Sequence, residues 1–166
     1  MDTVEFNGSK YPSFQAEGNA TQFAIPFAEK FCKGNGVDVG FGKKEWKFPG
    51  ATGADITDDS NDYEAFHLPY HLDYVYSSHC LEHIPDWVGA LEYWHQHLTP
   101  GGTIFLYLPH PEQEYWKPWN NRKHYHSLHS IDVMQCLLSL GLVNVFRSER
   151  DLNHSYMVVG EKAWTQ

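Results

Sequence analysis

The sequence is poor in basic residues and has no long apolar run. It contains 12 Lys and Arg against 21 Asp and Glu, a formal net charge of −9. Phosphate backbones and anionic lipid surfaces are bound through clustered basic residues, so this balance argues against nucleic acid and membranes as partners. No apolar run approaches the roughly 20 residues of a membrane span, and residues 1–10 lack signal-peptide features. We expect a cytoplasmic protein, monomeric or homodimeric.

Cysteine is scarce as well. Cys32, Cys80 and Cys136 are odd in number, and their spacing matches neither a disulfide framework nor a zinc site. We interpret them as small buried apolar residues. Two residue classes are abundant instead, because aromatics make up 16% of the chain and there are 11 histidines. This composition suits either a dense core or a stacking site for a flat ligand.

The order of predicted elements indicates one α/β domain spanning 1–166, because strands alternate with helices and no repeat or linker divides the chain. We expect a Rossmann-like, mostly parallel sheet with helices on both faces and an antiparallel C-terminal edge strand. Residues 1–18 are predicted to be an irregular lead-in, and a third strand within 57–66 looks reduced. The expected strands are 37–39, 51–56, 72–77, 103–108, 142–148 and 154–160, and the expected helices are 19–33, 85–98 and 130–140.

A glycine-containing loop, Asp38-Val39-Gly40-Phe41-Gly42, follows the first predicted buried strand. Glycine lets the backbone turn tightly and lets a ligand approach without meeting a Cβ. A dinucleotide fingerprint also needs a small residue three positions after the second glycine, where this chain has Glu45. NAD and FAD are therefore disfavoured. Taken alone the loop is a moderate signal, since Asp38 could equally cap backbone N–H groups in the turn.

Asp55 lies near the end of the second predicted strand, 51–56. A carboxylate at this position can accept hydrogen bonds from both hydroxyls of a ribose. Asp55 therefore fits any ligand that contains adenosine.

An ordered set of segments resembles the small class I S-adenosylmethionine-dependent methyltransferases of the UbiE/type-11 group, over about residues 34–145. No single piece is specific, but their order and spacing together are. The segments are Asp38-x-Gly40-x-Gly42, Asp55, 64–70, 73–84, 98–102 and 108–109.

The resemblance implies S-adenosylmethionine as cofactor and S-adenosylhomocysteine as product. The glycines would approach the methionine part, Asp38 would orient its amino group, and Asp55 would hold the ribose hydroxyls. Glu64 would lie near the adenine amino group, and backbone around Ser78 would line the methionine end. The full predicted cofactor set is Asp38, Gly40, Phe41, Gly42, Asp55, Ile56, Glu64, Ser78 and His79.

Three histidines are the catalytic candidates. Methyl transfer from a sulfonium is an in-line displacement, and a base is needed only for a hydroxyl or a protonated amine. Histidine, with an ordinary pKa of about 6.5, suits that role. His79 and His83 follow the strand 72–77, and His110 follows the next strand. A structural role is the alternative for each, particularly for His83.

Residues 110–129 form a long aromatic segment that we predict to be a substrate lid, and the alternative is a surface loop packed by its own aromatics. His124, His126 and His129 have no carboxylate or cysteine nearby in sequence and no helical i, i+4 pair, so we expect no metal there. The predicted function is methyl transfer to a small-molecule or sugar-like acceptor. The alternative is a non-catalytic module that binds S-adenosylmethionine or a partner, suggested by the short connection after the glycine loop and the weak third strand.

Overall fold

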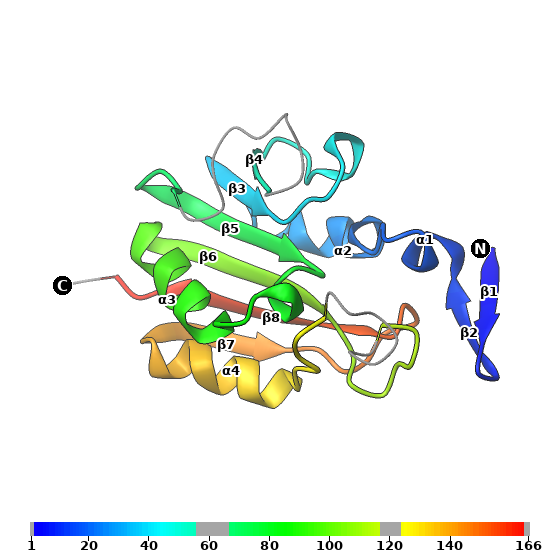
Figure 1. Ribbon diagram of the computed structural model, residues 1–166. Helices are drawn as coiled ribbons and strands as arrows, with labels where there is room; N and C mark the ends of the chain where they lie inside the picture. Colours follow the sequence, from blue (N-terminus) through cyan, green and yellow to red (C-terminus); the bar gives the residue numbers. More distant parts are fainter. Residues whose placement is uncertain (1, 56–66, 117–123, 165–166) are drawn as a thin grey trace.

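A six-stranded sheet forms the centre of the molecule in the computed structural model, which describes residues 2–55, 67–116 and 124–164. The strand order is β4-β3-β5-β6-β8-β7 (Figure 1). The first four strands in that order are parallel, whereas β8 runs antiparallel to both β6 and β7. The bounds are β3 Gly36–Val39, β4 Thr52–Ala54, β5 Leu72–Ser78, β6 Leu98–Pro109, β7 Leu142–Arg147 and β8 Ser155–Lys162.

Helices cover both faces of this sheet (Figure 1). Helix α2 (Thr21–Ala28) packs on one face, and α3 (Trp87–His97) and α4 (Ser130–Ser139) pack on the other. Because side chains alternate along a strand, β6 sends Phe105 toward α2 and Ile104 toward α3 and α4. Both faces of the central strands are apolar and buried, as expected for a sheet covered by helices on both sides.

The expected α/β architecture is confirmed. The parallel strands and the antiparallel C-terminal strand form where they were predicted, and the helices expected at 85–98 and 130–140 form close to their predicted bounds. The C-terminal strand β8 lies between β6 and β7, so β7 occupies the edge and runs antiparallel to its neighbour. Residues 57–66, where the reduced third strand was expected, lie outside the described residues.

The predicted irregular lead-in at 1–18 is wrong. β1 (Thr3–Phe6) and β2 (Ser9–Pro12) form an antiparallel hairpin, followed by the short helix α1 (Ser13–Ala16). The two-residue turn Asn7-Gly8 has φ values of 49° and 76°, which a tight hairpin requires. Gln15 then ties this segment to the domain, because its Nε2 donates to the Asn153 carbonyl at 2.6 Å.

Two further segments set up the site. The helix expected at 19–33 is shorter and begins at Thr21 rather than at an Asn19 cap, with Ala20 as its N-cap. The connection between β3 and β4 contains only a short 3-10 helix, η1 (Lys44–Trp46), as the sequence predicted. A helix long and apolar enough to cross a membrane is absent from the described part of the chain.

Candidate functional site

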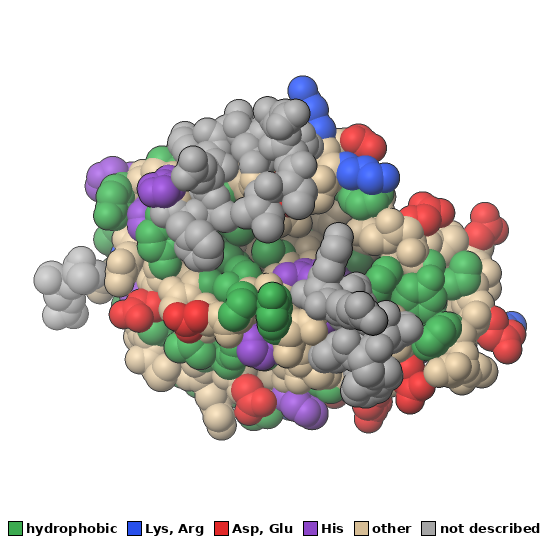
Figure 2. Space-filling view, viewed as in Figure 1, with side chains coloured by type: hydrophobic (Ala, Val, Ile, Leu, Met, Phe, Trp, Pro, Cys, Tyr) green, Lys and Arg blue, Asp and Glu red, His purple; other side chains and the backbone are tan. Residues whose placement is uncertain are grey.

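A cleft of about 780 Å³ opens at the carboxyl ends of β3, β4 and β5. Figure 2 shows a hollow near the middle of this face, with histidine side chains beside it. Ligands of open α/β sheets bind at this edge. The predicted site residues that line the cleft are Asp38, Gly40, Phe41, Gly42, Asp55, Ser78, His79 and His83.

The glycine loop follows β3 and makes a turn that L side chains rarely adopt. Gly40 and Gly42 have φ values of 79° and 72°, in the left-handed region that favours glycine. The Gly40 N–H donates to the Ala54 carbonyl at 2.8 Å, which fixes the loop against β4. A Cβ on Gly40 would lie 2.3 Å from Cys80 Sγ, so the loop passes directly against the chain that follows β5. Two strand ends are thereby held together around the cleft.

Asp55 lines the cleft at the end of β4 and also holds the glycine loop. Its Oδ2 accepts a hydrogen bond from the Gly42 N–H at 2.8 Å. Asp55, predicted to bind the ribose, is therefore hydrogen-bonded to Gly42, whose backbone is predicted to approach the methionine part of the cofactor.

Asp38 is almost fully buried, with 1% of its surface exposed, yet it lines the cleft. Its Oδ2 accepts from the Phe48 N–H at 2.7 Å, so the capping role left open by the sequence is real. Its Oδ1 has no hydrogen-bond partner within the described residues. Burial, together with the nearby Asp55 carboxylate, raises the pKa of Asp38 to about 7. A cationic group in the cleft would stabilise this carboxylate.

His79 lies just after β5, with a φ of 49°, and lines the cleft. Its Nε2 is 3.0 Å from Ser155 Oγ, and its Nδ1 is 3.8 Å from Glu82 Oε1. Burial and the neighbouring His124 and His83 lower the pKa of His79 to about 3. At neutral pH it is therefore an uncharged imidazole that orients partners by hydrogen bonding.

His83 ends the short 3-10 helix η2 (Leu81–His83) and lines the cleft beside His79. Its ring packs edge-on against His124, with ring centroids 4.3 Å apart. The cleft therefore has histidines from one short stretch of chain along one wall.

His110 does not line the cleft. Its N–H donates to the His154 carbonyl at 2.8 Å, and its Nδ1 accepts from the Glu112 N–H at 3.2 Å. Burial lowers the pKa of His110. The structure thus groups His79 and His83 but holds His110 toward β8.

The predicted lid contributes Tyr125 to the cleft, with 62% of its surface exposed. The N–H groups of Tyr125 and His126 both donate to the Glu82 carbonyl, at 2.9 and 3.2 Å. The end of the segment is therefore fastened to η2. Residues 117–123 lie outside the described residues, as do Ile56 and Glu64 of the predicted cofactor set.

Several cleft residues were missed by the sequence analysis. Trp46 belongs to η1, and its ring lies 4.2 Å from Lys43 Nζ. Thr21 begins α2 and shares a 2.6 Å hydrogen bond with the Tyr76 hydroxyl. Packing between distant segments brings these residues to the cleft, so their positions in the sequence do not predict it. The only signal in the sequence was its high aromatic content. The missed residues are Gly18, Ala20, Thr21, Trp46, Ala54, Cys80, Ile84, Pro85 and Trp94.

A family model for a methyltransferase domain matches residues 17–154. The fold is similar to an S-adenosylmethionine-dependent methyltransferase from Archaeoglobus fulgidus, at 18% identity and a TM-score of 0.69, over 86% of this chain and 92% of that chain. It is similar to another from Thermotoga maritima, at 15% identity and a TM-score of 0.68, over 90% and 92%.

A third similar structure is a phosphoethanolamine N-methyltransferase 2 from Haemonchus contortus, solved with S-adenosylhomocysteine. It has 12% identity and a TM-score of 0.63, over 89% of this chain and 53% of that chain. No curated protein sequence matches the chain. The structural likenesses concern the fold, and the family model covers most of the chain. The chain therefore belongs to the methyltransferase domain family.

Proposed function

We propose that the cleft binds S-adenosylmethionine and that the protein transfers its methyl group to a small-molecule or sugar-like acceptor. The observation that carries the proposal is the buried Asp38 carboxylate, whose Oδ1 lacks a hydrogen-bond partner among the described residues that surround the cleft. S-adenosylmethionine brings an ammonium group and a sulfonium, both cationic. An ammonium donor at Oδ1 forms a charge-assisted hydrogen bond and removes the cost of the buried charge.

The remaining contacts follow from the same placement. The Gly40 and Gly42 backbone lets the methionine part approach, and Asp55 at the end of β4 accepts from the ribose hydroxyls. The methyltransferase family and the solved neighbours support S-adenosylmethionine as the methyl donor. The connection between β3 and β4 contains only the three-residue η1, so the helix that a dinucleotide fold places after its glycine loop is reduced to one turn.

The reaction needs alignment more than acid–base chemistry. The acceptor atom attacks the methyl carbon opposite sulfur, and the sulfur leaves as a neutral thioether. Holding both reactants in line supplies several kcal/mol of the barrier. His79 and His83 lie at the wall where the methionine end is proposed to sit. The low pKa of His79 keeps its imidazole uncharged at neutral pH, and its Nε2 is 3.0 Å from Ser155 Oγ, so His79 shapes this wall and does not store a proton.

The size of the cleft supports a small acceptor. Its volume of about 780 Å³ lies within the roughly 300–1,000 Å³ of small-molecule sites. Because the cofactor takes a large share of it, the remaining space suits a molecule the size of a monosaccharide or smaller.

Methyl transfer is tested by incubating the protein with S-adenosylmethionine and pooled hydroxyl, amine and sugar compounds, and measuring S-adenosylhomocysteine. We expect product that depends on one pool. His83→Ala should reduce turnover by about 100-fold or more, because the acceptor loses its alignment with the methyl group, while S-adenosylhomocysteine affinity changes only a few-fold. Cofactor binding without turnover on any pool would favour the non-catalytic alternative.

Cofactor affinity should depend on pH through Asp38. With its pKa at about 7 in the free protein, Asp38 is mostly protonated at pH 6 and ionised at pH 8. An ammonium ligand binds the ionised form, so affinity should fall up to about tenfold per unit below pH 7. Binding at pH 6 should release nearly one proton, measured by calorimetry in buffers of different ionisation enthalpy. A flat profile between pH 5.5 and 8 would contradict the assignment.

A further inference from the structure

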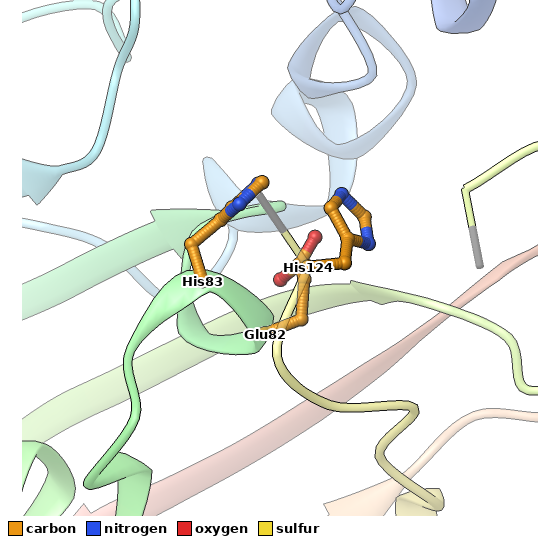
Figure 3. Close-up of side chains that lie close together, drawn as sticks. All are labelled: Glu82, His83 and His124. Carbon is orange, nitrogen blue, oxygen red and sulfur yellow. The ribbon is translucent and has the colours of Figure 1, made fainter. Parts of the chain in front are cut away.

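Three potential metal ligands converge beside the cleft. Glu82 and His83 come from η2, and His124 comes from the described end of the lid segment. Figure 3 shows the three side chains grouped together. One ligand atom from each residue lies within 4.8 Å of the others. The sequence expectation that His124 lacks a carboxylate partner considered only its neighbours in the chain, and the fold supplies Glu82.

Glu82 is a buried carboxylate in an unusual position. None of its surface is exposed, and neither Oε1 nor Oε2 has a hydrogen-bond partner among the described residues. Glu82 Oε1 lies 3.8 Å from His79 Nδ1, which is beyond hydrogen-bond distance. A buried carboxylate whose oxygens have no partner is costly, because its lost contacts with water are not replaced. A cation at this point removes that cost.

His124 shows the same unmet bonding capacity. It is 6% exposed, and its Nδ1 is buried with no hydrogen-bond partner among the residues described. The partnerless Nδ1 of His124 is independent of the partnerless Glu82 carboxylate, because the two residues belong to different segments of the chain. Both groups belong to the same small cluster.

The backbone holds these segments together without help from the side chains. The Glu82 carbonyl accepts from the N–H groups of Tyr125 and His126, and His126 Nε2 lies 2.9 Å from the Pro85 carbonyl. Tyr125, which follows His124, is thus hydrogen-bonded to the backbone of Glu82. A site framed in this way keeps its three side chains near one another before any ion arrives.

We propose that Glu82, His83 and His124 bind one divalent transition-metal ion of the zinc type, with an open coordination position toward the cleft. Two imidazoles and one carboxylate form a ligand set of catalytic zinc sites, in which a water or substrate takes the fourth position. Imidazole favours Zn²⁺ and Co²⁺ over Mg²⁺, which prefers oxygen ligands. In a tetrahedral site the ligand atoms lie about 3.4 Å apart, so the ion draws the cluster together through side-chain rotation.

The position of His83 on the cleft wall extends the inference to the acceptor, a step that rests on the proposed function. The ion, held by Glu82, His83 and His124, would lower the pKa of an acceptor hydroxyl at the open position, and the proton would pass to solvent water. The acceptor oxygen would then attack the methyl carbon of the sulfonium. An O–C bond forms, the C–S bond breaks, and sulfur keeps the electron pair as a neutral thioether. The acceptor class is therefore a hydroxyl compound.

Metal binding is tested on untagged, chelator-treated protein titrated with Co²⁺ in the absence of cofactor. We expect one equivalent of Co²⁺ to give visible absorption bands that Zn²⁺ displaces and equimolar Mg²⁺ does not. His124→Gln and His83→Gln should each weaken Co²⁺ binding by about 100-fold or more, beyond the roughly 10–100-fold cost of changing an outer-shell partner. His129→Gln is the matched control, since His129 is exposed and lies outside the cluster, and it should bind as the wild type does.

Glu82→Gln separates lost binding from lost folding. Because it removes a buried charge, we expect its melting temperature without metal to equal or exceed that of the wild type, while the rise that Zn²⁺ causes in the wild type disappears. Absence of Co²⁺ binding by the wild type, or unchanged binding by both histidine variants, would overturn the proposal. S-adenosylhomocysteine titration of the same metal-free protein tests the proposed function separately, so either result can fail alone.

Discussion

Asp38→Asn is expected to weaken S-adenosylhomocysteine binding by about 10- to 100-fold while making the free protein more stable above pH 7. The loss of affinity follows from replacing a carboxylate by an amide opposite an ammonium group, since hydrogen bonds to charged groups are worth about 1.5–3 kcal/mol. The amide oxygen still accepts from the Phe48 N–H, so the local backbone contact survives. Binding and stability therefore move in opposite directions.

The gain in stability has a defined pH window. The pKa of Asp38 rises from the ordinary carboxyl value of 3.8 to about 7 in the fold, mainly through burial. Its favourable contribution to stability is present below about pH 4 and is lost as the pH rises through 7. Asparagine has no such titration, so the variant should exceed the wild type by about 2–4 kcal/mol at pH 8, and this advantage should shrink toward pH 4.

The control for this prediction is Asp73→Asn. Asp73 lies in β5 near its amino end, away from the cleft, and its Oδ2 also accepts a backbone hydrogen bond, from Asn35 at 2.8 Å. Calorimetry with S-adenosylhomocysteine and denaturant unfolding at pH 5 and pH 8 should show unchanged binding in this variant. If Asp38→Asn binds the ligand as tightly as the wild type, Asp38 does not contact the cofactor amine.

Gly40→Ala is expected to destabilise the fold by about 2–4 kcal/mol and to abolish measurable cofactor binding. The new Cβ would lie 2.3 Å from Cys80 Sγ and 2.5 Å from its Cβ, at a φ of 79°. Left-handed strain costs of order 1–3 kcal/mol, and overpacking a filled site adds about 1–3 kcal/mol. Relief of the overlap requires the loop to move, and that loop is where the cofactor backbone contacts are proposed.

Gly42→Ala is the matched comparison two residues away. Its φ of 72° imposes the same kind of strain, but its Cβ would meet only the Trp46 ring, at 3.7 Å. We expect a smaller loss, of about 1 kcal/mol, with binding still measurable. Chemical unfolding and calorimetry on both variants decide the matter, and equal losses would show that overlap with Cys80 is not the cause.

The sheet and the cofactor end of the site were predictable because their signals are local. Valines between glycines mark β3, and a carboxylate at the end of β4 follows directly from its position in the chain. Parallel strands bring their carboxyl ends to one edge of the sheet, so the strand assignments alone predict that Asp38, Asp55 and His79 lie near one another. The hairpin at Asn7-Gly8 had an equally local signal, and it was missed because the polar lead-in looked irregular.

The acceptor end depended on contacts between distant segments. His110 follows β6, and β6 pairs with β8. The His110 N–H donates to the carbonyl of His154, just before β8, and this bond holds His110 away from the cleft. His124 reaches Glu82 only because neighbouring backbone donors bond to the Glu82 carbonyl. Neither arrangement follows from spacing, since both depend on how loops pack after the sheet has formed.

The most direct test of the central claim is a crystal structure of the protein with S-adenosylhomocysteine. The structure predicts the amino nitrogen of the ligand within hydrogen-bond distance of Asp38 Oδ1, its ribose hydroxyls on Asp55, and its sulfur facing the wall formed by His79 and His83. A ligand bound elsewhere, or one whose ribose does not meet Asp55, would contradict it.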